Sequence, residues 1–316
     1  MQKLDSSLIP FTLDRQYRDY VWGGSKLRPG HVPTAEVWAV YETNAVTSGP
    51  HTGLTLSELV KEYGVNLLGS KVTARIGSRF PILVKLLDCN QWLSLQVHPD
   101  DRQAEVMEGK GQFGKTEAWY FLDVEKKAEI LCGIKEGVSK TEIENSVQNG
   151  TILNNTDRIS VKKGDYVLIP AGTIHALGPG LLVYEVQESS DITYRVFDWN
   201  RPASEGRKLH IDQSIRVINP DRHAAVQASP TGEAAHKILS CDYFQLEKIV
   251  TGNNPVYTEL DGTTFHILTV ICGESEIAGE GWSFDLAQYD SLVIPACTPD
   301  YTIKSSSGCE ILRASA

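Results

Sequence analysis

Short apolar runs alternate with turn-forming residues along most of this chain, and this pattern constrains the fold most strongly. The runs are rich in Leu, Val, Ile and aromatic residues, and Gly, Pro, Asn and Asp separate them. Many short strands at such spacing are typical of a β-sandwich or jelly roll. We therefore predict a mainly β protein whose strands include residues 82–87, 93–97, 118–122, 166–169 and 181–184.

Helices are expected to be few and short. Thr55-Leu56-Ser57-Glu58 and Ser139-Lys140-Thr141-Glu142 have the spacing of a capping box, so each predicts a helix N-terminus. A third helix is predicted after Pro99-Asp100-Asp101, because proline suits a first helical turn and acidic residues suit the positive end of the helix dipole. These helices should decorate the sheets rather than form the core.

A weak internal repeat indicates two β units. Gly164-Asp165 is followed by an apolar run, Pro170-Ala171 and then His175. Asp290 is followed by a similar run and Pro295-Ala296, but this second copy has no histidine in the corresponding place. A chain of 316 residues also exceeds one typical core. We expect two jelly rolls, residues 1–225 and 226–316, joined where periodic sequence is lost between residues 221 and 236.

Composition limits the possible environments and partners. With 41% hydrophobic and 22% charged residues the chain should be globular, and it lacks a long apolar run or a secretion-signal pattern at its start, so we expect a cytoplasmic protein. A net charge of −10 argues against binding nucleic acid or an anionic membrane. An anionic substrate would need local positive charge. The six cysteines are scattered and predict structural thiols, and we expect a monomer or weak homodimer.

Four side chains have the chemistry and spacing of a metal site. Gln96 and His98 stand at i and i+2, so a strand would present both on one face. Glu117 and His175 lie on or beside neighbouring predicted strands. Two imidazoles, a carboxylate and an amide oxygen match the His₂Glu type of catalytic zinc site, which keeps a position open for water or substrate.

Several segments together carry a family resemblance. The chain resembles type I mannose-6-phosphate isomerases, in their short bacterial form, which are zinc-dependent members of the cupin superfamily. The resemblance is strong over roughly residues 15–210, and it rests on Val21-Trp22-Gly23-Gly24, Ala35-Glu36-Val37-Trp38, residues 93–100, Gly114-Lys115-Thr116-Glu117, residues 169–177 and residues 190–196.

The resemblance implies a site residue by residue. One Zn²⁺ per chain would be held by Gln96, His98, Glu117 and His175, so that residues 1–225 form the catalytic zinc-binding cupin domain and residues 226–316 a cupin-like domain without metal. The substrate would contact Lys85, Asp191 and Arg195, and the catalytic residues would be Arg195, Lys115 and Glu185. Arg201, Arg207 and Lys208 are further candidates for the phosphate site because they are close to Arg195 in sequence.

The implied reaction is the interconversion of D-mannose 6-phosphate and D-fructose 6-phosphate through an enediol or enediolate. It needs a base with a pKa near working pH, and either Glu185 or Lys115 could serve. Arg195 suits recognition of phosphate or an oxyanion, with a salt bridge to Asp191 or Asp198 as its structural alternative. The remaining histidines are expected to be ordinary core or surface residues: His31, His51, His210, His223, His236 and His266.

Other functions stay open at this point. A cupin isomerase or epimerase could act on another sugar phosphate, and an iron oxygenase could use the same scaffold, although a fourth ligand at Gln96 counts against the oxygenase. A non-catalytic regulator that binds sugar phosphates is the alternative from a different class. Exchange of the substrate C2 proton with solvent would distinguish the enzyme from the regulator.

Overall fold

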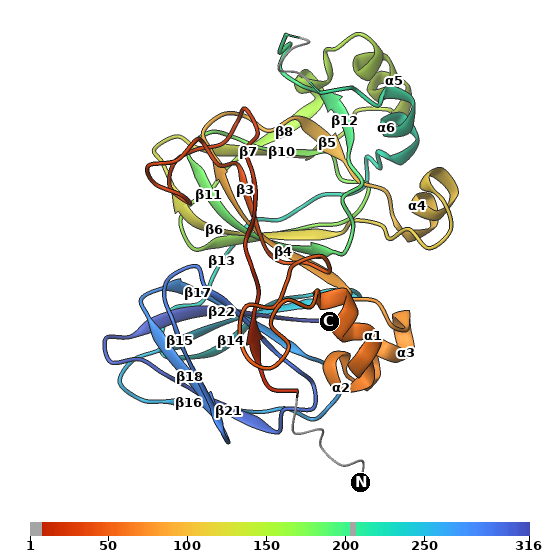
Figure 1. The fold of residues 1–316 in the computed structure, drawn as a ribbon. Coiled ribbons are helices and arrows are strands. Elements are labelled where there is room, and N and C mark those ends of the chain that lie inside the picture. The colour runs from red at the N-terminus through yellow and green to blue at the C-terminus, as the bar shows by residue number, and fades with distance from the viewer. Residues whose placement is uncertain (1–7, 203–206) are drawn as a thin grey trace. The chain divides into compact units, whose positions relative to one another are not determined.

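Residues 8–202 and 207–316 are described by a computed structural model (Figure 1). Two units can be separated by their internal contacts. The site unit comprises residues 17–38 and the described residues of 84–228. The second unit comprises the described residues up to Gln16, residues 39–83 and residues 229–316. The chain thus crosses between the units several times.

Two β-sheets supply the strands of the site unit, although the strands at residues 16–18, 36–40 and 82–89 each have one or two residues that the contact division assigns to the second unit. The seven-stranded sheet has the order β13-β9-β6-β11-β4-β3-β2, with bounds Gln227–Ala228, Asp165–Ile169, Glu117–Val124, Leu181–Glu188, Ile82–Cys89, Glu36–Val40 and Gln16–Arg18. The five-stranded sheet has the order β12-β5-β10-β7-β8, with bounds Tyr194–Phe197, Leu95–Val97, His175–Leu177, Glu129–Ile134 and Thr156–Ser160. Figure 1 shows the five-stranded sheet lying over the seven-stranded one.

The faces that the two sheets turn toward each other are joined by one hydrophobic core. Trp119 of β6 and Val183 of β11 belong to the same buried cluster as Ile130 of β7 and Leu177 of β10. Side chains alternate along a strand, so the same inner faces also include Glu117, Glu185 and His175. Each of these inner faces is therefore apolar along one part and charged along another.

The outer face of the five-stranded sheet carries a second apolar cluster. Leu131 of β7 and Val196 of β12 pack there with side chains of the helices α5 (Lys140–Gln148) and α6 (Ile211–Val217) and the 3₁₀ helix η1 (Ile152–Asn155). Figure 1 shows α5 and α6 beside this sheet. The helix α4 (Asp101–Glu108) stands in the connection from β5 to β6.

The second unit is also built from two sheets. The six-stranded sheet has the order β1-β20-β17-β22-β15-β14, with bounds Phe11–Thr12, Ser291–Ile294, His266–Cys272, Cys309–Ser315, Gln245–Thr251 and Ala234–Ser240. The four-stranded sheet has the order β16-β21-β18-β19, with bounds Val256–Glu259, Asp300–Lys304, Ser275–Gly279 and Trp282–Leu286. One apolar cluster draws on both sheets.

Three short helices belong to the second unit. They are α1 (Leu56–Tyr63), α2 (Val65–Leu68) and α3 (Ser70–Ile76). The backbone N–H of Ala296 donates to the Leu67 carbonyl, and that of Ser70 donates to the Gly262 carbonyl. These bonds fasten residues far apart in the sequence.

The predicted fold class is confirmed: the protein is mainly β, with two cupin-like jelly rolls and a few short helices. All five predicted strands are present, although β5 begins at Leu95 rather than residue 93. The capping boxes at Thr55 and Ser139 are both formed. The third predicted helix is α4, but Asp100 is its N-cap, so Pro99 precedes the first turn instead of lying in it.

The domain boundary near residue 225 stays a prediction about this chain. The contact units agree with a change near residue 228 but assign residues 39–83 to the unit that contains the C-terminal sheets. Residues 39–83 have little β periodicity, so no sequence pattern indicated to which of the two units they belong.

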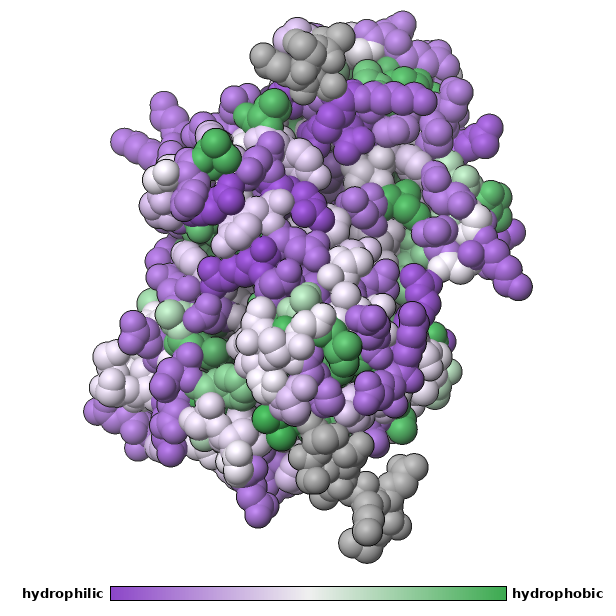
Figure 2. Space-filling view, in the orientation of Figure 1, coloured by the Kyte–Doolittle hydropathy of each residue, from purple (hydrophilic) through white to green (hydrophobic). Residues whose placement is uncertain are grey.

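Apolar side chains on the drawn face occur in small separate groups among hydrophilic ones (Figure 2). Large exposed apolar residues, such as Val32, Val106 and Tyr257, are far apart in the sequence. None of the helices in the described residues is long and apolar enough to span a membrane.

Replacing Leu131 by alanine should test the cluster under α5 and α6. Leu131 is fully buried, so Leu131→Ala should lower the free energy of unfolding by about 2–5 kcal/mol. Leu209→Ala is the matched control, because Leu209 is 40% exposed and should change it by less than about 0.5 kcal/mol. Equal effects in chemical denaturation would contradict this account of the cluster.

Candidate metal centre

Three ligand-type side chains meet at strand ends in the site unit. His98 directly follows β5, Glu117 is the first residue of β6 and His175 is the first residue of β10. In the five-stranded sheet Gln96 pairs with both His175 and Arg195, so these three residues form a row across the sheet. Strand pairing thus brings residues that are distant in sequence close together in the site unit.

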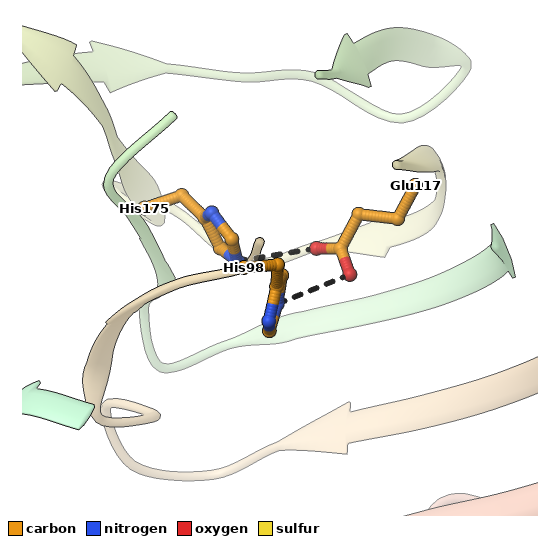
Figure 3. A group of neighbouring side chains, drawn as sticks. All are labelled: His98, Glu117 and His175. Carbon is orange, nitrogen blue, oxygen red and sulfur yellow. Dashed lines mark ion pairs between the residues drawn. The ribbon is translucent and has the colours of Figure 1, made fainter. Parts of the chain in front are cut away.

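The three side chains form a compact group (Figure 3). His98 Nε2 lies 3.4 Å from one Glu117 oxygen, and His175 Nε2 lies 3.2 Å from the other. The ligand atoms all lie within 4.8 Å of one another, and each residue is at most 1% exposed. This group could hold a metal ion.

Both imidazoles are oriented through their other ring nitrogen. His98 Nδ1 lies 2.8 Å from the carbonyl oxygen of Ile192, and His175 Nδ1 lies 2.9 Å from that of Thr173. A carbonyl only accepts, so each Nδ1 carries the proton and each Nε2 presents its lone pair to Glu117. Such bonds to the distal nitrogen are usual for metal-binding histidines.

Gln96 borders the same group. Its amide nitrogen lies 3.3 Å from His175 Nε2. Rotation of the amide by half a turn would present its oxygen instead, at no change in shape. The resulting donor set of two nitrogens, a carboxylate and an amide oxygen fits a divalent cation. A role of Gln96, His98, Glu117 and His175 as ligands stays a prediction.

Charge rather than hydrogen bonding compensates the burial of Glu117. Neither of its oxygens has a hydrogen-bond partner among the described residues, but the Lys115 ammonium lies 2.9 Å from one of them. Burial alone would raise the pKa of Glu117, yet the positive charge of Lys115, and that of the two histidines when they are protonated, outweighs it and holds the pKa well below its usual value. Burial and the Lys115 charge hold the pKa of His98 well below its usual value. A carboxylate and a neutral imidazole are the protonation states that metal binding requires.

A cavity in the site unit gathers the other predicted residues. It is lined by Lys85, Lys115, Glu185, Asp191 and Arg195, together with Tyr20, Trp22, Glu36, Leu87, Leu93, Gln96, Trp119, Leu177, Thr193 and Arg207. Tyr20, Glu36 and Trp119 were not predicted as site residues. Strand alternation could have identified Trp119, because it lies two residues from Glu117 and therefore on the same face of the strand.

Lys85 and Glu185 form a buried pair beside the candidate metal centre. Lys85 Nζ lies 3.3 Å from Glu185, 3.6 Å from Glu36 and 5.2 Å from the ring centre of Trp38. Burial would lower the pKa of Lys85, but Glu36 and Glu185 outweigh it and raise the pKa, so the ammonium persists. These acidic partners explain how a lysine can be buried within the otherwise mostly apolar strand β4.

Glu185 has a perturbed environment of its own. Trp119 Nε1 donates to one Glu185 oxygen at 2.9 Å, whereas the other oxygen has no hydrogen-bond partner among the described residues. Burial and the charge of Glu117 raise the pKa of Glu185 despite Lys85. A carboxyl group with a raised pKa in a cavity is a candidate for proton transfer.

Arg195 and Arg207 bring positive charge to the cavity. No carboxylate in the described part of the chain pairs with Arg195, and its buried Nε has no hydrogen-bond partner there. The salt bridge to Asp191 or Asp198 considered from sequence is therefore absent. Asp198 instead pairs with Arg201 at 2.5 Å and Arg207 at 3.6 Å. Burial and the charge of Arg195 lower the pKa of Arg207.

The other arginine candidate is committed elsewhere. Arg201 bonds Asp198 and the carbonyl of Trp92, and it does not line the cavity. Lys208 is exposed and does not line it either. Arg207 is therefore the favoured one of the three candidates near Arg195.

The second unit has no comparable group among its described residues. His266 Nδ1 lies 3.0 Å from the hydroxyl of Tyr301, and burial together with Arg313 lowers the pKa of His266 to about 3. Across residues 8–202 and 207–316, the group of His98, Glu117 and His175 is the one set of such side chains that could hold a metal ion.

Fold and site together define a cupin-like protein with a candidate metal centre between its sheets. Comparisons with known proteins narrow this class. The model of the family "phosphomannose isomerase type I, catalytic domain" matches residues 10–136. A probable mannose-6-phosphate isomerase of Bacillus subtilis is 33% identical over 96% of this chain and 98% of its own length. A mannose-6-phosphate isomerase of Streptococcus mutans is 35% identical over 90% of this chain and 92% of its own length.

Solved structures agree with these sequence matches. The crystal structure of a mannose 6-phosphate isomerase from Bacillus subtilis superimposes with a TM-score of 0.84. The match covers 97% of this chain and 99% of that chain, at 32% sequence identity. A putative mannosephosphate isomerase from Archaeoglobus fulgidus shares the fold, with 24% identity, a TM-score of 0.79 and 98% of each chain covered. The chain belongs to the type I phosphomannose isomerase family.

Removing one partner of the Lys115–Glu117 pair should expose the cost of an unpaired buried charge. In metal-free protein, Glu117→Leu should lower the free energy of unfolding by about 3–5 kcal/mol, since Lys115 loses its carboxylate. Lys115→Met added to Glu117→Leu should recover most of this loss. Denaturant unfolding of both variants measures the effect.

The control for this cycle is Glu129→Gln, which breaks a partly exposed pair with Arg158 and should change the free energy of unfolding by about 1 kcal/mol or less. Charge compensation would be contradicted if the double variant lost as much free energy of unfolding as the two single variants lose together.

Proposed function

We propose that this chain is a zinc-dependent isomerase that interconverts D-mannose 6-phosphate and D-fructose 6-phosphate through an enediol or enediolate. The observation that carries the proposal is the buried group of His98, Glu117 and His175 beside a cavity with cationic and acidic side chains. Relatives named mannose-6-phosphate isomerase over nearly the whole chain support the substrate.

The metal would be held by His98, Glu117 and His175, with Gln96 as a fourth ligand, at one ion per chain. Zinc suits this mixture of imidazole and oxygen donors. When bound there, zinc supplies Lewis-acid polarisation of the sugar's carbonyl. The residues of the chain provide the rest of the chemistry.

Glu185 is the proposed base. The reaction removes a proton from C2 of the aldose and returns a proton to C1, so one carboxyl group can serve in both directions without a net change in its charge. Burial raises the pKa of Glu185, and one of its oxygens has no hydrogen-bond partner among the described residues, although the Lys85 ammonium lies 3.3 Å from it. Lys115, which is held beside Glu117 and His98, would stabilise negative charge developing on the sugar oxygens.

The phosphate would be bound by the cavity's arginines. Arg195 has a buried Nε without a partner among the described residues, and Arg207 Nη2 donates to Ser94 Oγ at 3.3 Å. Lys85 and Asp191 line the same cavity and would contact the sugar. These cations supply the local positive charge that a chain with a net charge of −10 needs for an anionic substrate.

Zinc removal and replacement test the proposal directly. Formation of fructose 6-phosphate from mannose 6-phosphate is followed with zinc-loaded protein, chelated protein, and chelated protein supplied with zinc again. We expect chelation to abolish turnover and zinc to restore it. Protein that binds zinc and mannose 6-phosphate without turnover or C2 proton exchange would favour the non-catalytic regulator instead.

The base assignment has its own test in the variants Glu185→Gln and Lys115→Met. Glu185→Gln should reduce kcat by about 10²–10⁴-fold and suppress exchange of the C2 proton with solvent deuterium, since the amide cannot accept that proton. Zinc stoichiometry, measured in parallel, should remain one per chain. Retained exchange in Glu185→Gln with lost exchange in Lys115→Met would transfer the role of base to Lys115.

A further inference from the structure

Arg195 lines the cavity from an edge strand of its sheet. It lies on β12, and the pairing of β12 with β5 shifts register between Arg195 and Phe197. Such a bulge or irregularity loosens the ladder and redirects side chains. The Arg195 guanidinium has no carboxylate partner in the described part of the chain, and its buried Nε has no hydrogen-bond partner there. The direction of this side chain is therefore set mainly by its backbone.

Both backbone groups of Arg195 are bonded to His210. The Arg195 N–H donates to His210 Nδ1 at 3.2 Å, and the His210 N–H donates to the Arg195 carbonyl at 2.8 Å. The two bonds resemble the paired bonds between residues of neighbouring antiparallel strands, although one acceptor is a side chain. Because β12 ends its sheet, these bonds lie on its outer edge and fix the backbone beside the irregularity.

His210 is itself held in place from two sides. It is the residue before α6, and its carbonyl accepts a hydrogen bond from the Ser214 N–H of that helix at 2.9 Å. Figure 1 shows α6 beside β12. The centre of the His210 ring lies 6.1 Å from that of Tyr194, whose hydroxyl donates to Glu108 at 2.8 Å. The histidine is therefore a fixed point for the edge strand.

The His210 side chain does not cap its own helix. At the residue before a helix, Ser, Thr, Asp and Asn are preferred because their oxygens accept from the first turn. His210 makes no such side-chain bond to α6. Its Nδ1 accepts from Arg195 instead, so Nε2 carries the proton of the neutral ring. The ring thus stabilises the strand rather than the helix.

We propose that His210 is a positioning residue, which fixes the Arg195 backbone at the strand edge and thereby directs the Arg195 guanidinium into the cavity. The inference rests on the proposed function, in which Arg195 binds the phosphate of the sugar. His210 does not line the cavity, so it acts through Arg195 rather than on the substrate. From sequence alone His210 was expected to be an ordinary histidine, because it stands 15 residues from Arg195 and no local pattern links the two.

The variant His210→Phe removes the acceptor but keeps a ring beside Tyr194 and the backbone N–H. It should weaken binding of mannose 6-phosphate, measured by calorimetry, by about three- to tenfold, and it should raise KM more than it lowers kcat, since about one hydrogen bond is lost. Zinc stoichiometry should not change. His31→Phe is the matched control, because His31 is an exposed histidine of the same unit, and it should stay within about twofold of wild type. Folded His210→Phe protein with wild-type affinity and KM would overturn the inference.

Protonation of His210 should act like the substitution, because a protonated Nδ1 cannot accept from the Arg195 N–H. The groups that face His210 are Arg195, Lys208, Glu108 and the ring of Tyr194. Burial and the charges of Arg195 and Lys208 lower the pKa of His210 from its ordinary 6.5, against the opposing charge of Glu108. The acceptor is therefore present at neutral pH and is lost only in more acidic solution.

The pH dependence separates this hydrogen bond from simple packing. The affinity of wild type for mannose 6-phosphate, divided by that of His210→Phe, should fall toward one as His210 is protonated. Titration of the phosphate and of other side chains occurs in both proteins and cancels in this ratio. The Cε1 proton resonance of His210, which the variant lacks, gives the pH range over which to measure. A ratio that stays constant across this range would contradict the hydrogen bond.

Hydrogen exchange of the Arg195 amide needs neither metal nor substrate. In protein labelled with ¹⁵N-arginine, this amide should exchange about three- to tenfold faster in His210→Phe than in wild type, and other arginine amides should not change. Faster exchange in a protein without isomerase activity would support the positioning role while the proposed function fails. Unchanged exchange would overturn the positioning role whatever the activity.

Wild-type protein alone decides the question should His210→Phe not fold. Protection of the Arg195 amide, corrected for the intrinsic effect of pH on exchange, should decrease as His210 is protonated. Constant protection through the titration of His210 would overturn the inference.

Discussion

The fully buried carboxylate of Glu117 is the constraint on which the rest of the site depends. An isolated charge in this position would be costly to desolvate, so the structure must supply opposite charge at close range. Lys115 does so at 2.9 Å, whereas the two imidazoles turn lone-pair nitrogens toward the carboxylate and supply no opposite charge while they are neutral. A divalent cation would complete the compensation, because the imidazole nitrogens and the carboxylate could then all coordinate it.

The same strands build the core and the site because alternation preserves a face along the whole strand. On β6 the inner face carries Glu117, Trp119 and Phe121. The candidate ligand Glu117 is therefore followed on the same face by two residues of the hydrophobic core. Trp119 belongs to both, since its ring packs in the core while its Nε1 donates to Glu185. Packing of the core therefore fixes the position of the proton-transfer candidate without a flexible loop.

The sequence predicted elements with strong local signals and missed relations that depend on tertiary contact. Capping boxes identified α1 and α5, and strand spacing brought Gln96 and His98 to one place with Glu117 and His175. No local pattern predicted α2 or α3, because their ends are glycines without side-chain caps. The pairing of Lys85 with Glu36 was equally invisible, since it joins strands whose order in the sheet the sequence does not state.

The contrast between the two units explains why one jelly roll carries a candidate metal centre and the described residues of the other do not. In the second unit the polar groups around Tyr301 satisfy one another: its hydroxyl meets His266 and Arg313, and Arg313 also pairs with Glu247 at 2.7 Å. In the site unit both Glu117 oxygens, one Glu185 oxygen and Arg195 Nε lack hydrogen-bond partners among the described residues. Buried polar groups left without hydrogen-bond partners within a fold are expected where a ligand supplies the missing partner. A jelly roll therefore becomes a binding site when its interior charges remain incompletely paired, and a scaffold when they pair with one another.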